Sequence, residues 1–488
     1  MAPRRTSPVK IGFAALLLAT AAAADEPEPP DDTSSAPDMS TEGADRIGEE
    51  AEPGPSFEPP GLHLGSLVLS GDLSQKYRFR TTSRESDQDL YGYLNLDGRL
   101  PHEGAKGARP YSSLNFNFQG SYNLDIDSFR GSGDPQGSFI PFSDITNTYQ
   151  ERLQGYIYSA YVELEELRSF ELARAGRQQI YREYGILFDG GRVRTERWNT
   201  LALEVYGGLP AHLHESSPRG DAFAGAGVDS ALLPGLVVGA DYFYIRDERD
   251  RGLPDSDEHV YLGRGTYRAN EEWRIDASAS WVDTRDRLQQ VIASYNSIDW
   301  GLAGTLRAAR QNGVADFQSS EISPYVFIEG SYAPYYQFTL DLRQPIGDTF
   351  GAGGGVDVRQ LEDESDDRLY NHSFRNFYLQ ADAAELWPGS RLTVRGDLWD
   401  TVGGDDIHSV GFEVDQKVGE LLRARAGTSF ALYRIDLFTG KERERDRLYY
   451  LRLRWNVARG LEVDTDYHYE RDSVTEYHTL IVGIRKWF

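Results

Sequence analysis

Cysteine is absent from all 488 residues, which excludes a fold held by the disulfides on which small exported domains rely. After residue 24 no apolar run approaches the roughly 18 residues of a membrane-spanning helix. Hydrophobic content is only 39%, yet 12% of the residues are aromatic. This combination suits strands that are apolar on one face. The net charge of −26 argues against a nucleic-acid partner.

The first 24 residues predict a secretory signal peptide. Arg4, Arg5 and Lys10 precede a short apolar run, and small residues lead to an expected cleavage near Ala24. A membrane protein without an apolar helix must be a closed barrel, because only helices and barrels satisfy their backbone polar groups in lipid.

Residues 25–60 are rich in proline and acidic, with twelve carboxylates against Arg46 alone. Such a segment cannot bury enough apolar surface to offset its ordering entropy. We expect a disordered periplasmic spacer at 25–60, followed by a barrel at 61–488.

From residue 61 onward the chain repeats about ten residues of alternation and then a turn signal. The clearest strand places apolar and aromatic side chains on one face, namely Leu114, Phe116, Phe118, Tyr122 and Leu124. Its other face carries Asn115, Asn117, Gln119, Ser121 and Asn123. A row of amides fills a protein core poorly but lines water well. Short turns alternate with longer polar loops, as in outer-membrane barrels.

The number of strands follows from these segments. Every candidate together gives 22 strands, but alternation is weak at 186–207 and 287–311. Without those four we predict about 18 strands, in a range of 16 to 22. The fold class is therefore an all-β transmembrane antiparallel barrel.

The chain ends on an alternating strand with an apolar face formed by Leu480, Val482, Ile484 and Phe488. This strand resembles the closing strand of Gram-negative outer-membrane barrels. In those proteins the barrel-assembly machinery reads the terminal Phe. The resemblance implies that machinery as a partner, although Lys486 stands where an apolar residue is usual.

A second resemblance covers about 25 residues. Residues Ala173 to Gln178 and Gly185 to Arg194 resemble the R-x-G-R-Q … F-D-G-x-R hairpin of alginate-export-type porins. In that family arginines line a pore for an acidic polysaccharide, so Arg177 and Arg192 become candidate pore residues. The alternative is a structural hairpin in which Arg177 pairs with Asp189.

Nearly all basic residues are arginines, whose planar fork suits carboxylate groups. Strand alternation predicts further pore-lining residues, namely Arg343, Arg395, Arg423, Arg425, Arg452, Arg454, Asp415, Asp464 and Asp466. Three-residue turns would pair Asp415 with Arg425, Arg454 with Asp466, and Arg452 with His468. Such a charge-compensated wall could select solutes or only stiffen the barrel.

Catalytic chemistry has little support. Asp464, Asp466 and His468 could imitate an acid–histidine site, but alternation alone produces such clusters. His212 and His214 belong to an expected outer loop. No phosphate loop or cysteine-based metal site occurs, and we expect no enzyme activity, metal or cofactor.

The sequence thus predicts a porin in the outer membrane of a Gram-negative bacterium, surrounded by lipid. The favoured solute is a secreted acidic polysaccharide, handled with a periplasmic export component. A general or sugar-uptake diffusion porin is one alternative, and a structural sleeve or scaffold for a periplasmic or surface partner is another. The sequence leaves open whether loop 127–148 occludes the lumen.

Overall fold

The computed structural model describes most of the chain from residue 62 onward. The described residues are 62–82, 86–102, 111–126, 153–181, 185–211, 220–247, 256–283, 285–312, 334–363, 373–401, 407–431, 434–436, 441–443, 446–471 and 476–488. The predicted signal peptide, the acidic segment at 25–60, loop 127–148, His212 and His214 lie outside them. No helix among the described residues is long and apolar enough to cross a membrane.

The described regular structure consists of β-strands. Their bounds are β1 Leu62–Leu64, β2 Leu67–Thr81, β3 Ser86–Pro101, β4 Ser113–Asp125, β5 Leu153–Leu167, β6 Phe170–Tyr181, β7 Gly185–Thr195, β8 Leu201–Pro210, β9 Ala222–Leu233, β10 Leu236–Asp247, β11 Ser256–Arg268, β12 Trp273–Val282, β13 Arg285–Asn296, β14 Ala303–Gln311, β15 Tyr335–Ile346, β16 Phe350–Leu361, β17 Phe374–Ala384, β18 Ser390–Thr401, β19 Ile407–Val418, β20 Leu422–Ala431, β21 Arg434–Asp436, β22 Lys441–Arg443, β23 Asp446–Ala458, β24 Leu461–Arg471 and β25 Glu476–Trp487.

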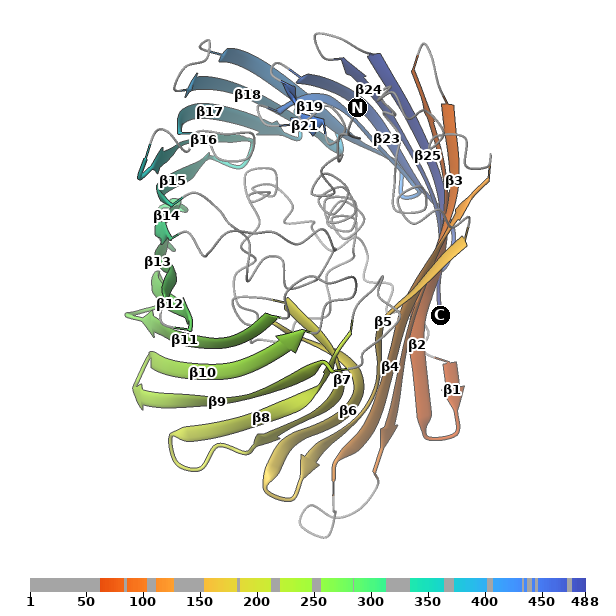
Figure 1. The fold of residues 1–488 in the computed structure, drawn as a ribbon. Helices are drawn as coiled ribbons and strands as arrows, with labels where there is room; N and C mark the ends of the chain where they lie inside the picture. Colours follow the sequence, from red (N-terminus) through yellow and green to blue (C-terminus); the bar gives the residue numbers. More distant parts are fainter. Residues whose placement is uncertain are drawn as a thin grey trace, which may run out of the picture.

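Twenty-two of the described strands form one closed antiparallel barrel (Figure 1). Each strand from β2 to β20, and then β23 to β25, pairs with the next along the chain. The ring closes where β25 pairs with β2. Strand β1 extends β2 as a short hairpin, and β21 and β22 form a separate ribbon. The predicted all-β barrel is confirmed.

The preferred count of about 18 strands is wrong. The four discounted segments are real strands, β7, β8, β13 and β14, each paired on both sides. Glycines and short polar residues interrupt alternation in them, as at Gly190 and Gly191. Backbone pairing with two neighbours fixes these strands where their own side-chain pattern is weak.

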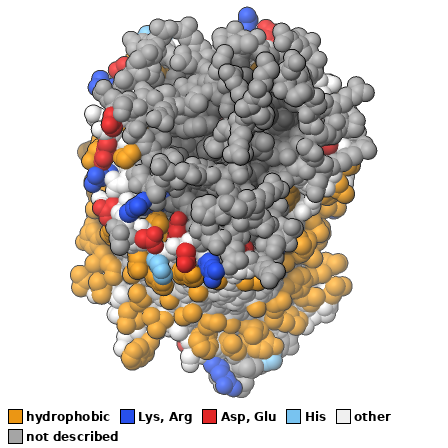
Figure 2. Space-filling model, in the orientation of Figure 1, with side chains coloured by type: hydrophobic (Ala, Val, Ile, Leu, Met, Phe, Trp, Pro, Cys, Tyr) orange, Lys and Arg blue, Asp and Glu red, His pale blue; other side chains and the backbone are white. Residues whose placement is uncertain are grey.

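The two faces of the barrel wall differ as alternation predicts. On β8, Leu203 and Val205 are 52% and 61% exposed, whereas Glu204 and Tyr206 between them are 4% and 3% exposed. Figure 2 shows apolar side chains gathered in a broad band over the lower part of this view. The exposed apolar face is the outside of the barrel, and lipid is its natural cover.

The predicted amide-lined strand is β4. Its amides share the inner face with Asp97 and Glu163 of the neighbouring strands, and Phe116 and Phe118 face outward. This assignment is confirmed.

The seam between β2 and β25 uses the last residue of the chain. The backbone N–H groups of Gly71 and Phe488 each donate to the other's carbonyl oxygen at 3.0 Å. Lys486 is paired with Leu73 within the seam, and its Nζ donates to the carbonyl oxygen of Arg459 at 3.1 Å. The terminal strand therefore closes the barrel as predicted, and Lys486 caps the turn beside it.

One predicted register is wrong by two residues. Arg454 stands opposite Asp464, and Arg452 stands opposite Asp466. The turn is Arg459–Gly460, two residues long, and the register shifts between Asn456 and Ala458. A bulge of this kind adds one residue to one strand only, so counting from a turn cannot anticipate it.

An apolar cluster interrupts the polar inner face. Its members, on β6 to β12, are each exposed by 3% or less and comprise Ile180, Ile186, Phe188, Tyr206, Phe223, Phe243, Ile245, Val260 and Val282. The rings of Phe188 and Phe223 lie 4.9 Å apart. Alternation does not predict this cluster, because a lumen-facing surface is expected to be polar.

Candidate functional site

Arginines concentrate on the inner face of three strands, β18, β20 and β23, with β19 lying between β18 and β20. We call this surface the arginine wall, and its members are Arg391, Arg395, Arg423, Arg425, Arg452 and Arg454. Alternation places every second residue of each strand on the same face. The inner position of each arginine therefore follows from its place in the alternation of its strand, once the strand pairing is known.

Two pairs of like charges stand directly opposite each other in the arginine wall. Arg423 faces Arg454, and Arg425 faces Arg452, across the β20–β23 pairing. Like charges in this position repel, which destabilises the pair. Asp415 offsets part of the repulsion, because its carboxylate accepts from Arg423 at 2.6 Å and lies 3.1 Å from Arg425. The predicted pairing of Asp415 with Arg425 is confirmed.

The β23 arginines are the most exposed members of the arginine wall. The side chains of Arg452 and Arg454 are 49% and 61% exposed. Arg452 lies 3.2 Å from Asp466, and Arg454 lies 3.6 Å from Glu462. Ion pairs that are this exposed to solvent are weak. Both guanidinium groups can therefore also interact with a dissolved anion.

A tyrosine and a glycine organise one part of the wall. Tyr450 stands opposite Gly427, where a Cβ would come within 2.7 Å of the tyrosine oxygen. Because glycine leaves this space open, the Tyr450 hydroxyl reaches Glu413 and donates to its carboxylate. The guanidinium of Arg452 lies 5.1 Å from the Tyr450 ring centre.

The same arrangement recurs farther round the barrel. Tyr378 stands opposite Gly355, its hydroxyl donates to Asp341, and Arg395 lies 4.1 Å above its ring. Arg395 also bonds Asp397 at 2.9 Å. Neither tyrosine is predicted from the sequence as a residue of the site. The pattern that identifies them is a tyrosine paired with a glycine on the next strand, and it can be recognised only when the strand register is known.

The remaining inward candidates have charged partners. Arg343 lies 3.5 Å from Asp382, and Arg192 pairs with buried Glu204. These contacts fit a charge-compensated wall, with cross-strand pairs contributing roughly 0.2–1 kcal/mol each.

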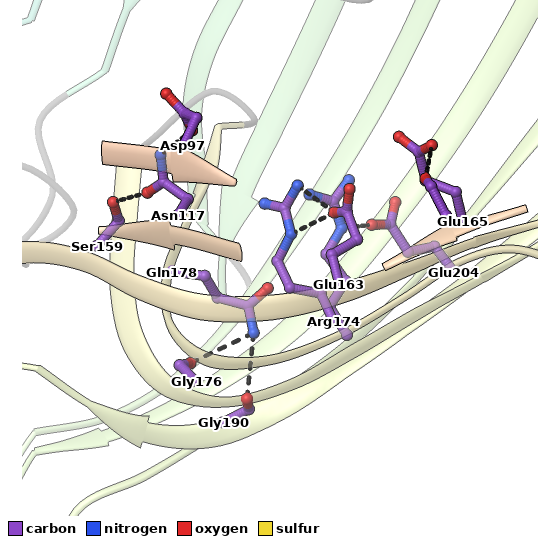
Figure 3. A network of polar contacts seen from close by, with 12 residues as sticks. Asp97, Asn117, Ser159, Glu163, Glu165, Arg174, Gly176, Gln178, Gly190 and Glu204 are labelled. Carbon is purple, nitrogen blue, oxygen red and sulfur yellow. Dashed lines mark hydrogen bonds and ion pairs between the residues drawn. The ribbon is translucent and has the colours of Figure 1, made fainter. Parts of the chain in front are cut away.

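Figure 3 shows the inner face of β3 to β8, where amides and ion pairs form several small groups of polar contacts. Asn117 donates to Asp97 at 2.7 Å and accepts from Ser159. Arg174 donates to Glu163 at 2.7 Å. In this part of the lumen, Arg174 and Arg192 each have a carboxylate partner, Glu163 and Glu204.

Arg177 lies on the outer face of the barrel. It stands opposite Asp189, which stands opposite the exposed Leu209, so all three lie on the outer face. The Arg177 Nη2 lies 2.7 Å from Asp189 Oδ2. The prediction that Arg177 lines the pore is wrong, and the alternative of a paired structural hairpin is confirmed. Both Arg174 and Arg177 belong to the motif, and their odd spacing places only Arg174 inside.

The described residues contain no group of three or more potential metal ligands from His, Asp and Glu. His468 Nε2 lies 2.6 Å from Asp466, which also contacts Arg452. In this setting Asp466 is part of the charged wall.

A closed barrel with an apolar exterior and a polar, charged interior defines a protein that spans the membrane with its strands. It is an outer-membrane β-barrel. No family model matches the sequence. No curated protein matches it either.

Solved structures with a similar barrel are outer-membrane channels. OpdK from Pseudomonas aeruginosa is 14% identical, with 86% of this chain and 99% of that chain covered and a TM-score of 0.39. A BenF-like porin from Pseudomonas fluorescens Pf-5 is 13% identical, with 86% and 99% covered and a TM-score of 0.40. OccAB4 from Acinetobacter baumannii is 8% identical, with 89% and 100% covered and a TM-score of 0.43. At these values the likeness concerns the barrel and says nothing about the solute.

Proposed function

We propose that the protein is an outer-membrane diffusion channel for small hydrophilic solutes and that it favours anions such as carboxylates. The observation that carries this proposal is the pair of like-charge contacts, Arg423 with Arg454 and Arg425 with Arg452. Opposed guanidinium groups on a solvated wall are stabilised by an anion between them. Their planar forks match a carboxylate in geometry as well as charge.

The mechanism is passive. A solute that loses part of its hydration shell in a narrow pore meets arginines and carboxylates that replace lost contacts. Arg452 and Arg454 would attract an anion, while Asp415 and Asp466 keep the wall from binding it too tightly. Rapid release is as necessary for conduction as entry.

Polysaccharide export has less support than diffusion of small solutes. That hypothesis rested on Arg177 and Arg192 lining a pore, but Arg177 faces outward and Arg192 is paired with Glu204. What remains of the resemblance to alginate-export-type porins is the sequence of the hairpin formed by β6 and β7. A diffusion channel, the alternative from the sequence, is therefore our main proposal.

Planar-bilayer recordings test this function. For the wild type we expect ion conductance with anions preferred over cations. Replacing Arg452 and Arg454 with Gln removes two charges, each worth roughly 1 kcal/mol at about 4 Å in water. The anion-to-cation permeability ratio should fall about fivefold or more, as measured from reversal potentials in a salt gradient.

Arg310→Gln is the matched control, because Arg310 stands opposite the exposed Tyr336 on the outer face. Its selectivity should equal that of the wild type. Unchanged selectivity in the double variant would contradict the role of the arginine wall. A folded barrel without any conductance would instead favour the structural sleeve. Block by acidic oligosaccharides but not by small carboxylates would favour polysaccharide export.

A further inference from the structure

One histidine lies on the inner face of the barrel, next to the arginine wall. His468 belongs to β24, which lies between β23 and β25 (Figure 1). It is paired with Tyr450 of β23, whose hydroxyl reaches Glu413 across the inner face. The side chain of His468 is 23% exposed, so its imidazole can exchange protons with the water of the lumen.

The other histidines on the described strands of the barrel face outward. Each is paired with or hydrogen-bonded to an exposed residue of the outer face, namely His259 with Tyr242, His408 with Leu398 and His478 with Tyr467. Among the barrel strands that the structure describes, His468 is therefore the histidine that faces the solute. A change of histidine charge that acts on the described wall of the pore thus acts at this position.

His468 shares one carboxylate with an arginine of the arginine wall. Its Nε2 lies 2.6 Å from Asp466 Oδ1, and Arg452 Nε lies 3.2 Å from Asp466 Oδ2. While His468 is neutral, Asp466 balances Arg452, and the three side chains together carry no net charge. When His468 is protonated, the same carboxylate faces two cations, and the group carries one positive charge. Protonation therefore makes this part of the lumen more attractive to anions.

Charged groups around His468 come from its own strand and from the strands beside it. The titratable and charged side chains of the inner face nearest to it are Tyr450 and Arg452 of β23, Asp466 and Glu470 of β24, Tyr477 of β25 and Arg80 of β2. Thr479 is paired with both His468 and Arg80, and Arg80 donates to Asp87 at 2.6 Å. Carboxylates, tyrosines and arginines ordinarily titrate outside the interval from about pH 5 to about pH 8, in which histidine changes its charge.

A protonated His468 lengthens the row of cations toward the extracellular end of the pore. Successive inward pairs on β23 and β24 are Arg454 with Asp464, Arg452 with Asp466, and Tyr450 with His468. The first of these pairs lies nearest the Arg459–Gly460 turn, and short turns are periplasmic in outer-membrane barrels. Consecutive inward positions on a strand are about 7 Å apart. An anion that arrives from outside would therefore meet His468 before it reaches Arg452.

We propose that His468 is a specificity-determining residue of the channel and that its protonation strengthens the preference for anions. The inference rests on the function proposed above, because it concerns the selectivity of the arginine wall. At alkaline pH the neutral imidazole donates to Asp466, and the wall attracts anions with its arginines alone. At acid pH the imidazolium adds a positive charge beside Arg452, so anions enter at a lower electrostatic cost.

Reversal potentials in a fixed gradient of potassium chloride test this inference at about pH 5.5 and about pH 8, on either side of the ordinary titration of histidine. For the wild type we expect an anion-to-cation permeability ratio about twofold higher at the lower pH, the effect of one charge about 7 Å from the ion in water. His468→Gln cannot be protonated but still offers a donor to Asp466. Its ratio should equal the alkaline value of the wild type at both pH values. His468→Lys is charged throughout, so its ratio should equal the acid value at both.

His478→Gln is the matched control, because His478 lies on the adjacent strand β25 and contacts Tyr467 on the outer face. Its permeability ratio should depend on pH as that of the wild type does. Heat-dependent mobility in gel electrophoresis shows which variants have folded. If His468→Gln does not fold, the comparison of the wild type with His468→Lys still decides.

A wild type that prefers anions equally at both pH values would overturn this inference and leave the proposed channel function intact. So would a folded His468→Gln variant that keeps the pH dependence of the wild type, since another group would then cause it. The absence of conductance, or of an anion preference at either pH, would contradict the proposed function and this inference together.

Discussion

At the scale of single residues, parity decides what a charged side chain does in this barrel. Arg174 and Arg177 are three positions apart on β6, and so they point to opposite faces. Arg174 bonds Glu163 inside, whereas Arg177 bonds Asp189 outside. Identical residues in one motif therefore serve a lumen and a lipid-facing surface.

The outward pair gives a prediction about stability. Asp189→Leu leaves the Arg177 guanidinium without its carboxylate on the lipid face, where an uncompensated arginine costs about 2–4 kcal/mol at mid-bilayer and less near the interface. We expect the free energy of unfolding in lipid vesicles to fall by about 2 kcal/mol. Urea titration followed by tryptophan fluorescence measures it.

The double variant Asp189→Leu with Arg177→Leu is the control. It removes both charges, so its stability should recover to the wild-type value or exceed it, while conductance stays unchanged. A double variant as unstable as the single one would show that the Arg177–Asp189 ion pair itself stabilises the hairpin, and that the loss of stability does not come from an unpaired charge.

At the scale of elements, the pairing of strands carries information that no single strand contains. The β23–β24 register differs by two residues from the predicted one, because the turn has two residues instead of three and the register shifts by one more residue between Asn456 and Ala458. The tyrosines at 378 and 450 each face a glycine only in the observed registers. Local alternation establishes a face, and the neighbouring strand establishes the partner.

Cysteine pairs can test this register, because the chain has no cysteine of its own. Directly paired residues have Cα atoms about 4.5–5.5 Å apart, within reach of a disulfide. Oxidation should therefore cross-link Arg454→Cys with Asp464→Cys several times faster than Arg454→Cys with Asp466→Cys. Mass spectrometry of digested protein quantifies both, and faster linkage to position 466 would support the register predicted from the sequence.

At the scale of the whole molecule, the barrel separates two surfaces with opposite requirements. Its outside is apolar, apart from features such as the Arg177–Asp189 pair. Its inside combines a basic surface on β18 to β23 with an amide and ion-pair network on β3 to β8 and an apolar cluster on β6 to β12. The lumen is thus chemically asymmetric, because different sectors of its wall carry different kinds of side chain.

The asymmetry predicts that selectivity depends on salt. The field of the arginine wall extends about 10 Å at 0.1 M salt but only about 3 Å at 1 M. The wild type's preference for anions should therefore weaken steadily as salt rises at a fixed gradient ratio. Reversal potentials measure this dependence. A preference that is equally strong at 1 M salt would assign selection to pore size or direct binding instead of the long-range field.

The sequence by itself determined the class of fold, because a period of two residues is local and a barrel wall needs it on every strand. It also determined the closing strand and the amide-lined strand β4. Only the tertiary structure decided the 22-strand count, the outward position of Arg177, the registers and the inner apolar cluster. Where both faces carry similar residues, or a bulge intervenes, backbone hydrogen bonding to the neighbouring strands selects the parity and the partner.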